Sequence, residues 1–435
     1  FFFQAEDGIR DSSVTEFRRV LFRSREMIRL NSIAAACVAA LALAANCRAE
    51  NWPQFRGPTG LGYTTEKNLP LIWNVKSGEN IRWKTPLPKS DNAYSSPIVW
   101  GDRVFVTSAV NSPIEHHVLC FQVSDGKLLW DTSVPPGPWQ LKDLRGGYGA
   151  PTPATDGKSV FVVFGSAVIA SLDFDGKIIW RKELEKFAFD VALGSSPVLH
   201  GDTVILDCDQ TGKTSSFIGL DKATGTIKWE EKRPQANFAH STPVLANVKG
   251  KAQLLVSASG AVQGLDPANG KILWWCAAPG DASSPAFNGS LVFADSGRGG
   301  RAVCVDPSGA GDVTKSHLKW TFPQIPEGLS SAIIVGDFVL RTHNPETLRC
   351  LRLSTGDAVF NERLAGVSTW ASPFATPDGK VFFASAGKSY VVQAGEKLEV
   401  LATNDLGEEN RASAAVSAGK IFLRGNKNLY CIGQP

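Results

Sequence analysis

The segment Gly264–Trp274, GLDPANGKILW, is the unit from which the rest of the chain is built. Its first three residues end an apolar strand, Pro267 to Gly270 supply a turn, and Lys271 opens a strand that ends on a large aromatic residue. Related segments are ASLDFDGKIIW (170–180), GLDKATGTIKW (219–229), CFQVSDGKLLW (120–130) and CLRLSTGDAVF (350–360). The sequence therefore predicts a β-repeat protein.

The repeats are spaced regularly and number eight. Their closing aromatic residues recur every 40 to 50 positions, at Trp130, Trp180, Trp229, Trp274, Trp320 and Phe360. A Ser or Thr followed by Pro marks the start of most repeats, at Pro97, Pro153, Pro197, Pro243, Pro285 and Pro373, and Ala332 and Ala414 take that place in two others. Because four short strands cannot bury both faces alone, the repeats must stack. We predict an all-β, eight-bladed β-propeller.

The two ends of the repeat region complement each other. The last repeat, residues 412–433, stops after its third strand, whereas Ile81–Lys84 is a lone strand that carries Trp83. We therefore expect the first strand to complete the last blade and to remove the edge of an open sheet. Six tryptophans are predicted to pack between successive blades: Trp83, Trp130, Trp180, Trp229, Trp274 and Trp320.

The first 49 residues are expected to precede the mature protein. Residues 1–26 match no part of the repeat, and the one methionine is Met27, so we interpret 1–26 as a non-native leader. Residues 27–49 have the pattern of a signal peptide, with Arg29 before an apolar run, and predict an exported, periplasmic protein. The apolar run is too short for a transmembrane helix, and we expect no transmembrane segment. The alternative is a lipoprotein acylated at Cys47, which Asn46 fits poorly.

Residues 50–80 form an arm before the propeller, which spans residues 81–435. The arm is rich in Pro and Gly and carries Trp52 and Phe55, so it cannot be a regular strand. We expect it to plug one face of the ring with its aromatic residues packed. The alternative is a ligand-binding role for Arg56.

The charge of the chain argues against nucleic acid as a partner. The formal net charge is +3, and it falls to +1 for residues 50–435 because the first 49 residues hold seven Lys or Arg and five Asp or Glu. No basic run is present. Neither nucleic acid nor an anionic membrane is therefore expected to bind. We expect a monomer.

The cysteines follow the repeat. Cys120, Cys304, Cys350 and Cys431 are predicted to share one position, which Ala170, Gly219 and Gly264 fill in other repeats. Such a position requires a small buried group, and free cysteine suits it. Cys208 and Cys276 lie outside this position, so the sequence remains compatible with one disulfide. The absence of CxxC argues against a metal or redox pair.

The loops indicate where a site would lie. The turns between first and second strands and between third and fourth strands are short, whereas the links between blades and between second and third strands are predicted to be longer and to share a face. Function concentrates on long loops held by a rigid scaffold. The candidate ligand-binding residues of this face are Arg145, Tyr148, His240, Asp281, Arg298, Arg301, His343, Trp370 and Arg411, with Asn92, Tyr94, Trp139, Asp190, Glu408 and Glu409 beside them.

Familiar catalytic and metal motifs are not met. The segment from Asp207 begins like a calcium loop but has Ile218 where a bidentate carboxylate is needed. A phosphate loop at Gly212 lacks its upstream glycine, and neither HExxH nor GxSxG occurs. Arginines and aromatics around a central opening suit an anionic, planar or peptide ligand.

The repeat resembles the tryptophan-docking repeat, A-x-D-x-x-T-G-x-x-x-W, of the pyrroloquinoline-quinone (PQQ)-like propeller superfamily. The resemblance covers nearly all of residues 50–435. The arm NWPQFRGPTGLG and the ending LRGNKNLYCIG further resemble exported bacterial PQQ-binding-like repeat proteins, which are related in fold to BamB. The resemblance implies the fold more strongly than the function, because the tryptophan packs on the next blade with or without a quinone.

Two functions are compatible with this resemblance. Quinone-dependent dehydrogenases of the superfamily carry adjacent, disulfide-bonded cysteines and a calcium held by carboxylates; this sequence has no adjacent cysteines and no matching carboxylate set. We therefore favour a non-catalytic exported scaffold or binding module with a protein or peptide partner, with a small-molecule ligand as a second possibility. The alternative is a quinoprotein oxidoreductase that uses PQQ and a divalent metal such as calcium to oxidise an alcohol or sugar.

Overall fold

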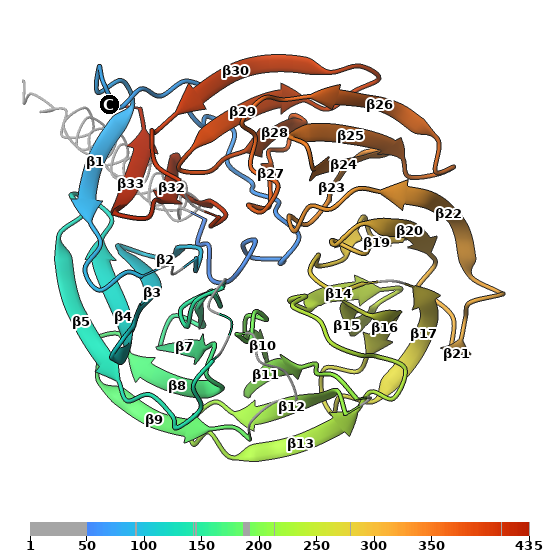
Figure 1. The fold of residues 1–435 in the computed structure, drawn as a ribbon, viewed down its shortest axis with the longest axis horizontal. Coiled ribbons are helices and arrows are strands. Elements are labelled where there is room, and N and C mark those ends of the chain that lie inside the picture. Colours follow the sequence, from blue (N-terminus) through green and yellow to red (C-terminus); the bar gives the residue numbers. More distant parts are fainter. Residues whose placement is uncertain are drawn as a thin grey trace, which may run out of the picture. The chain divides into compact units, whose positions relative to one another are not determined.

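The computed structural model describes residues 50–91, 94–141, 143, 146–185, 192–212, 214–278, 280–409 and 411–434. The predicted leader, the predicted signal peptide and Cys47 lie outside these residues. Every regular element in the described part of the chain is a β-strand. These strands form eight sheets arranged as the blades of a ring, which confirms the predicted eight-bladed propeller (Figure 1).

The first four blades each take four strands in chain order, from the strand nearest the axis to the outer strand. Blade 1 contains β2 (Ile98–Trp100), β3 (Arg103–Asn111), β4 (Ile114–Gln122) and β5 (Leu128–Val134); blade 2 contains β6 (Ala154–Thr155), β7 (Ser159–Phe164), β8 (Val168–Asp173) and β9 (Ile178–Glu183). Blade 3 contains β10 (Val198–His200), β11 (Thr203–Cys208), β12 (Ser216–Asp221) and β13 (Ile227–Lys232); blade 4 contains β14 (Val244–Val248), β15 (Lys251–Ala258), β16 (Gly260–Leu265) and β17 (Ile272–Ala278).

The next three blades repeat this order, and the last one joins the two ends of the ring. Blade 5 contains β18 (Ala286–Phe287), β19 (Val292–Asp295), β20 (Gly300–Val305) and β22 (Leu318–Ile325); blade 6 contains β23 (Ile333–Val335), β24 (Phe338–His343), β25 (Thr347–Arg352) and β26 (Ala358–Arg363). Blade 7 contains β27 (Phe374–Ala375), β28 (Lys380–Phe383), β29 (Lys388–Gln393) and β30 (Glu399–Asp405); blade 8 contains β31 (Ala415–Ser417), β32 (Lys420–Arg424), β33 (Asn428–Gly433) and β1 (Ile81–Pro86).

The first strand closes the ring, as the sequence predicts. β1 pairs antiparallel with β33, and Trp83 lies opposite Cys431. Blade 8 thereby gains the outer strand that the last repeat lacks, and no sheet edge is left where the ring would otherwise open (Figure 1).

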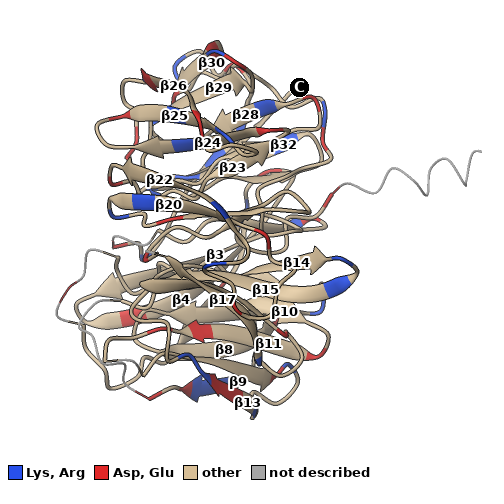
Figure 2. Cartoon of the chain, turned by 90° about the vertical axis from the view of Figure 1, so that its right-hand side faces the viewer, with Lys and Arg blue, Asp and Glu red and all other residues tan. Residues whose placement is uncertain are grey.

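Burial follows the position of a strand within its blade. The second and third strands lie between neighbouring blades and are mostly buried; β11, for example, is buried at every residue. Outer strands such as β5 alternate exposed and less exposed side chains, since one face meets solvent. In the side view of Figure 2, Lys and Arg mix with Asp and Glu along strand ends and turns, in line with the near-neutral net charge.

Most closing tryptophans contact a turn of the next blade. The indole N–H groups of Trp83, Trp130, Trp180 and Trp320 donate to backbone carbonyls in the following blade at 2.7–2.9 Å. Their rings lie against the positive-φ glycine of the same turn, where a methyl group would approach the ring to 2.6–2.7 Å. Trp229 lies against such a glycine too, without an indole hydrogen bond. That these contacts stabilise the ring stays a prediction.

Trp274 is an exception. It is 0 % exposed, and its indole N–H donates to Gln253 Oε1 of the same blade at 2.8 Å. The turn of blade 5 is enlarged over residues 306–317, and its short strand β21 (Gly311–Asp312) pairs in parallel with β17 beside Trp274. The insertion therefore covers a tryptophan position that is half exposed in most other blades.

The repeat position that holds Cys, Gly or Ala lies opposite the closing aromatic residue. For blade 2 the sequence assigned the wrong residue to this position. Cys120, Cys304, Cys350, Gly219 and Gly264 face their aromatic residues as expected. In blade 2, however, Ser171 and not Ala170 lies opposite Trp180. The turn of blade 2 is one residue shorter than that of blade 3, which displaces the alignment by one.

The six described cysteines are all free and buried. No disulfide therefore joins Cys208 and Cys276 in this structure. Burial raises the pKa of Cys120, Cys304, Cys350 and Cys431 to about 12, so these thiols stay protonated at neutral pH.

The arm packs across one end of the ring, as its composition predicts. Trp52 is 1 % exposed and pairs through its backbone with Val99. In blade 7, the N–H of Ala375 donates to the Gly62 carbonyl, and the Ala375 carbonyl accepts from the Thr64 N–H. Figure 1 shows the arm crossing the centre of the ring. The guanidinium of Arg56 is buried and donates to the carbonyls of Leu61 and Ala332 at 2.9 and 2.7 Å, so it joins the arm to blade 6.

The loop lengths differ from the expectation in one respect. Links between blades are long, such as residues 135–153 and 364–373. Links between second and third strands are mostly short, as at residues 112–113, 165–167 and 259, with residues 209–215 as the long case. Most of the long-loop face is therefore built by the links between blades.

His116 provides a pH-dependent contribution to stability. It is 0 % exposed, stacks on Phe164 with ring centroids 4.2 Å apart, and shares a hydrogen bond with Ser166 through Nε2 at 3.1 Å. Burial, with smaller contributions from Arg181 and His117, lowers its pKa from 6.5 to about 3. The folded protein thus holds His116 neutral where the unfolded chain binds a proton.

We expect acid to destabilise the wild type more than the His116→Phe variant. Because the folded pKa is depressed, this stabilisation is full above the unfolded pKa of 6.5 and is lost as the pH falls toward 3. Between pH 6 and pH 5 the free energy of unfolding of the wild type should fall by about 1 kcal/mol relative to the variant. Urea titrations at the two pH values measure this difference, and parallel pH profiles would contradict it.

Candidate functional site

A cavity of about 200 Å³ lies on the propeller axis at the long-loop face; we call it the axial cup. All eight links between blades contribute to its wall, so no single blade forms it. Its lining comprises Tyr94, Asp143, Gly146, Ala150, Ala192, Gly194, His240, Ala282, Leu329, Trp370 and Arg411 from these links, with Arg298 from the link between β19 and β20.

Arg411 and two aromatic rings form one side of the cup. The guanidinium carbon of Arg411 lies 3.9 Å from the ring centroid of Trp370 and 5.1 Å from that of Tyr94. Trp370 is nonetheless 39 % exposed, which is unusual for a tryptophan in this protein. A cation held over aromatic faces with one side open suits a planar or anionic ligand.

An ion pair and a histidine form the opposite side. Arg298 Nε donates to Asp281 Oδ2 at 2.7 Å, and burial raises the pKa of Asp281 although Arg298 opposes that shift. The backbone N–H of His240 donates to the carbonyl of Asp281, and the His240 ring meets Phe238 edge-on at 4.7 Å. Gly194 leaves room for this histidine, since a methyl group there would lie 2.7 Å from His240 Nδ1.

The cup continues along the axis as a narrower cavity of about 100 Å³ that ends at Phe55 of the arm. One Ser or Thr from each blade surrounds it: Ser96, Thr152, Ser196, Thr242, Ser284, Ser331, Ser372 and Ser413. These are the residues that stand before Pro97 and its equivalents in the repeat. The sequence pattern marked their positions as blade starts, but it did not identify them as lining a cavity.

A second cavity of about 360 Å³ opens beside the cup over blades 6 to 8. It shares Tyr94, Trp370 and Arg411 with the cup and adds Glu346, Lys388 and Glu409. We call it the trough. An extended segment lying in the trough could reach the cup past Arg411 without any change in the fold.

The remaining sequence candidates lie elsewhere. Tyr148 and Trp139 are buried in the core of blades 2 and 3, and the hydroxyl of Tyr148 accepts from the Leu141 N–H. His343 is 2 % exposed, with Nδ1 against the carbonyl of Asn344 and Nε2 against Asn361. Arg301 is exposed and contacts the Ala277 carbonyl. Glu408 accepts from Tyr430 and Asn428 within blade 8. Asn92, Arg145 and Asp190 fall outside the described residues.

The described residues do not fit a quinone–metal centre. No three His, Cys, Asp or Glu side chains among them gather as metal ligands. Asp143 is the one acidic residue in the described lining of the cup, and Asp281 next to Ala282 of the lining is already engaged by Arg298. Arg411 and Trp370 could contact a planar anion. The described residues provide too few ligands for the divalent metal ion that quinone-dependent oxidation needs.

The segment that resembles a calcium loop is an internal ion cluster. Asp207 and Asp209 are both 1 % exposed and share the guanidinium of Arg233, which also donates to Gln263 at 2.7 Å. Burial raises the pKa of both carboxyls, and mutual repulsion adds to the effect on Asp207. One arginine is thus shared by two buried acids.

Comparisons with known proteins agree with the fold and with the resemblance of the repeats. A family model described as outer membrane protein assembly factor BamB matches residues 115–362. No curated protein matches this chain significantly. No helix in the described residues has the length and apolar character needed to cross a membrane.

Similar solved structures include a natural assembly factor, a designed protein and an enzyme. BamB from Moraxella catarrhalis is 13 % identical, with 81 % of this chain and 96 % of that chain covered and a TM-score of 0.59. The computationally designed Ika8 protein is 12 % identical, covering 81 % and 99 % at a TM-score of 0.56. A europium-containing methanol dehydrogenase is 12 % identical, covering 86 % and 89 % at a TM-score of 0.50.

At these identities the structural neighbours establish the propeller fold and leave open the choice between scaffold and enzyme. The family model carries more weight, because it spans more than half of the sequence and lies within the propeller. The chain therefore belongs to the family described as outer membrane protein assembly factor BamB.

Proposed function

We propose that this chain is an exported, non-catalytic binding module that captures a segment of a partner protein at the axial cup. The observation that carries the proposal is Arg411, which lies over Trp370 and Tyr94 at the junction of the cup and the trough. Exposed aromatic and arginine side chains in a concave site are typical anchors of protein interfaces. The chain acts as a monomer with one cup.

Three features favour binding over catalysis. The cup holds an arginine–carboxylate pair and a cation over aromatic rings, both suited to recognition. The trough extends the cup in one direction and suits an extended peptide. A scaffold role also agrees with membership of a family described as an assembly factor. Export rests on the signal pattern of residues 27–49, with acylation at Cys47 as the alternative.

Affinity capture with matched variants tests the proposal. The immobilised protein is incubated with an envelope extract of the source organism, and retained proteins are identified by mass spectrometry. We expect the Trp370→Ala, Arg411→Ala double variant to lose a specific partner that the wild type retains. The control variant, Ile179→Ser with Ile227→Ser, changes two exposed residues of the outer strands β9 and β13 and should retain it. Equal retention by all three proteins would contradict a role for the cup.

The quinoprotein alternative is tested on the same protein. PQQ with calcium is titrated into the wild type, and dye reduction is followed with a panel of alcohols and aldoses. Because the described residues offer too few ligands for the metal, we expect neither saturable quinone binding nor dye reduction. Stoichiometric binding with turnover would replace the binding function by an oxidoreductase.

A further inference from the structure

A closed ring of hydrogen bonds surrounds the propeller axis below the cup. The backbone N–H of one Ser or Thr per blade donates to the side-chain hydroxyl of the equivalent residue in the next blade, at 2.8–3.1 Å. In ring order the members are Ser96, Thr152, Ser196, Thr242, Ser284, Ser331, Ser372 and Ser413, and the N–H of Ser413 returns to Ser96 Oγ. We call this set the hydroxyl ring. The Pro that follows six of the members favours the extended backbone that this arrangement needs.

The hydroxyl ring has unused donors that face a cavity. Its members are only 2–7 % exposed, and each hydroxyl oxygen already accepts one backbone N–H. Within the described residues no acceptor lies opposite any of the eight O–H groups. All eight border the cavity of about 100 Å³ that joins the cup to Phe55. Buried hydroxyl donors without acceptors are costly unless a ligand or water accepts from them.

The charge around the hydroxyl ring favours an anion. Arg424 is 1 % exposed and donates to Ser95 Oγ at 2.8 Å, one residue from the ring, while Arg56 donates to Ala332, which follows Ser331. Among the described residues neither arginine has a carboxylate partner. Burial lowers the pKa of Arg424 to about 9 and that of Arg56 to about 10. Both therefore stay charged at neutral pH, and Arg411 adds a third positive charge at the mouth.

The hydroxyl groups of the ring are also strong hydrogen-bond donors, which favours an anion. Each O–H is polarised by the N–H that its oxygen accepts, which strengthens it as a donor. The acidic groups nearby offset this only in part, because Asp281 is neutralised by Arg298 and Asp143 stands at the mouth. Arg341 near Ser330 is likewise neutralised by Asp295.

We propose that the hydroxyl ring is a recognition site for a carboxylate group inserted along the propeller axis past Arg411. The inference rests on the proposed function and specifies the chemistry of its ligand. An ionised carboxylate only accepts hydrogen bonds, with two oxygens, and so matches a ring of donors. A primary amide of the same shape is neutral and offers one acceptor oxygen in place of two, so it uses fewer of these donors and gains nothing from the positive charges. The narrow cavity admits the carboxylate, and the aromatic rings of the mouth contact the rest of the ligand.

Calorimetric titration of the purified protein tests the ligand chemistry. The probes are a capped pentapeptide with one central glutamate, its glutamine counterpart, a neutral pentapeptide with a free C-terminal carboxylate, and free glutarate. At least one carboxylate probe should bind about tenfold or more tightly than the glutamine peptide, which lacks the charge. The comparison of the three carboxylates separates a side chain, a chain terminus and a small diacid as the source.

Paired variants locate the binding. Thr152→Val with Thr242→Val removes two ring hydroxyls, whereas Thr152→Ser with Thr242→Ser keeps them. We expect the valine variant to lose about tenfold or more of the carboxylate affinity and the serine variant to retain it. Ser171→Ala, which changes a buried serine opposite Trp180 in β8, serves as the control away from the axis and should bind normally.

Two results would overturn the inference: no carboxylate probe that binds more tightly than the glutamine peptide, or unchanged carboxylate affinity in the valine variant. If the valine variant does not fold, the comparison of the carboxylate probes with the glutamine peptide on the wild type still decides. Failure here is distinct from failure of the proposed function. A partner captured through Trp370 and Arg411, in the absence of carboxylate selectivity, would leave the proposed function standing.

Discussion

Replacing Trp274 with alanine should destabilise the propeller by about 3 to 5 kcal/mol, the usual range for truncating a large buried aromatic residue. Trp274 is 0 % exposed and shares a hydrophobic cluster with Phe287 of blade 5. The variant loses this packing and also leaves Gln253 Oε1 without the indole N–H that it accepts. The free energy of unfolding from urea titration gives the effect.

Trp130 provides the matched control within the same repeat position. It is partly exposed, and its indole donates to the Phe174 carbonyl at 2.9 Å. Trp130→Ala should therefore destabilise less than Trp274→Ala, because less apolar area returns to water on truncation. If Trp274→Ala unfolded at the same urea concentration as the wild type, the closing tryptophans would have no role in holding blades together.

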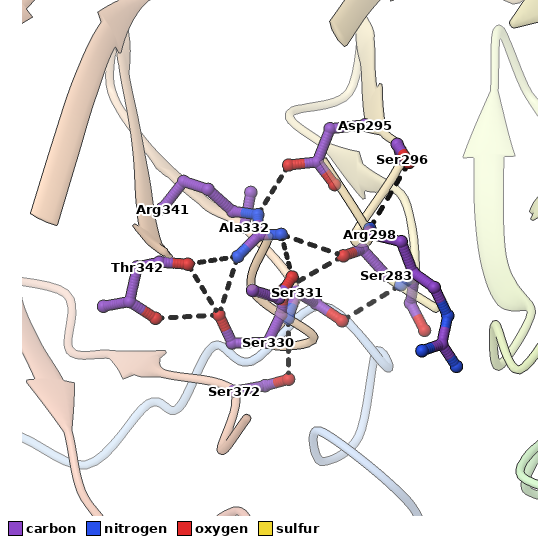
Figure 3. A network of polar contacts seen from close by, with 12 residues as sticks. Ser283, Asp295, Ser296, Arg298, Ser330, Ser331, Ala332, Arg341, Thr342 and Ser372 are labelled. Atoms are coloured by element: carbon purple, nitrogen blue, oxygen red, sulfur yellow. Dashed lines mark hydrogen bonds and ion pairs between the residues drawn. The ribbon is translucent and has the colours of Figure 1, made fainter. Parts of the chain in front are cut away.

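Replacing Arg341 with methionine should destabilise the protein by about 3 to 5 kcal/mol, because it leaves a buried charge without its partner. Arg341 of β24 is 1 % exposed and donates to Asp295 Oδ2 of blade 5 at 2.5 Å, so the pair joins two blades. Its other donors reach Ser330, Ser283 and the carbonyl of Thr342 (Figure 3). They also reach the carbonyl of Gly328. Urea titration again measures the loss.

Two further variants show whether burial is the cause. Adding Asp295→Asn to Arg341→Met removes the uncompensated charge, and the double variant should be more stable than Arg341→Met alone. Arg352→Ala changes an arginine of the same blade that pairs with Glu396 at the surface, and solvent screening should leave stability nearly unchanged. An Arg341→Met variant as stable as Arg352→Ala would contradict the inferred role of the buried pair.

The ring could be predicted because most repeats contain the residues that are typical of a propeller blade. A closing aromatic residue recurs in seven of the eight blades, and a lone first strand with Trp83 complements a last repeat that lacks its fourth strand. The sequence assigned Ala170 to the position that Ser171 occupies, because the turn of blade 2 is one residue shorter. An error of one residue in a strand exchanges its two faces. The cover over Trp274 could not be predicted, since an enlarged turn does not indicate which neighbour it meets.

The axial site was predictable only in part. Link length predicted that Trp370, His240, Arg298 and Arg411 lie on the long-loop face, and all four line the cup; that they bind a ligand stays a prediction. It could not distinguish them from His343, which is the last residue of β24 and has both ring nitrogens engaged by Asn344 and Asn361. Whether a loop side chain turns inward depends on such local partners. In the sequence the hydroxyl ring appeared only as a Ser or Thr before the Pro of most repeats. That these residues meet around the axis follows only from the three-dimensional structure.

Site-specific photo-crosslinking tests the central claim, partner capture at the axial cup, most directly. A photo-reactive benzoylphenylalanine replaces Trp370 at the mouth of the cup in one protein and Ile179 on the outer strand β9 in another, and both are irradiated in cells that export them. We predict a discrete crosslinked partner from position 370 and none from position 179. Crosslinks from position 179 alone, or the same products from both positions, would contradict a binding site on the propeller axis.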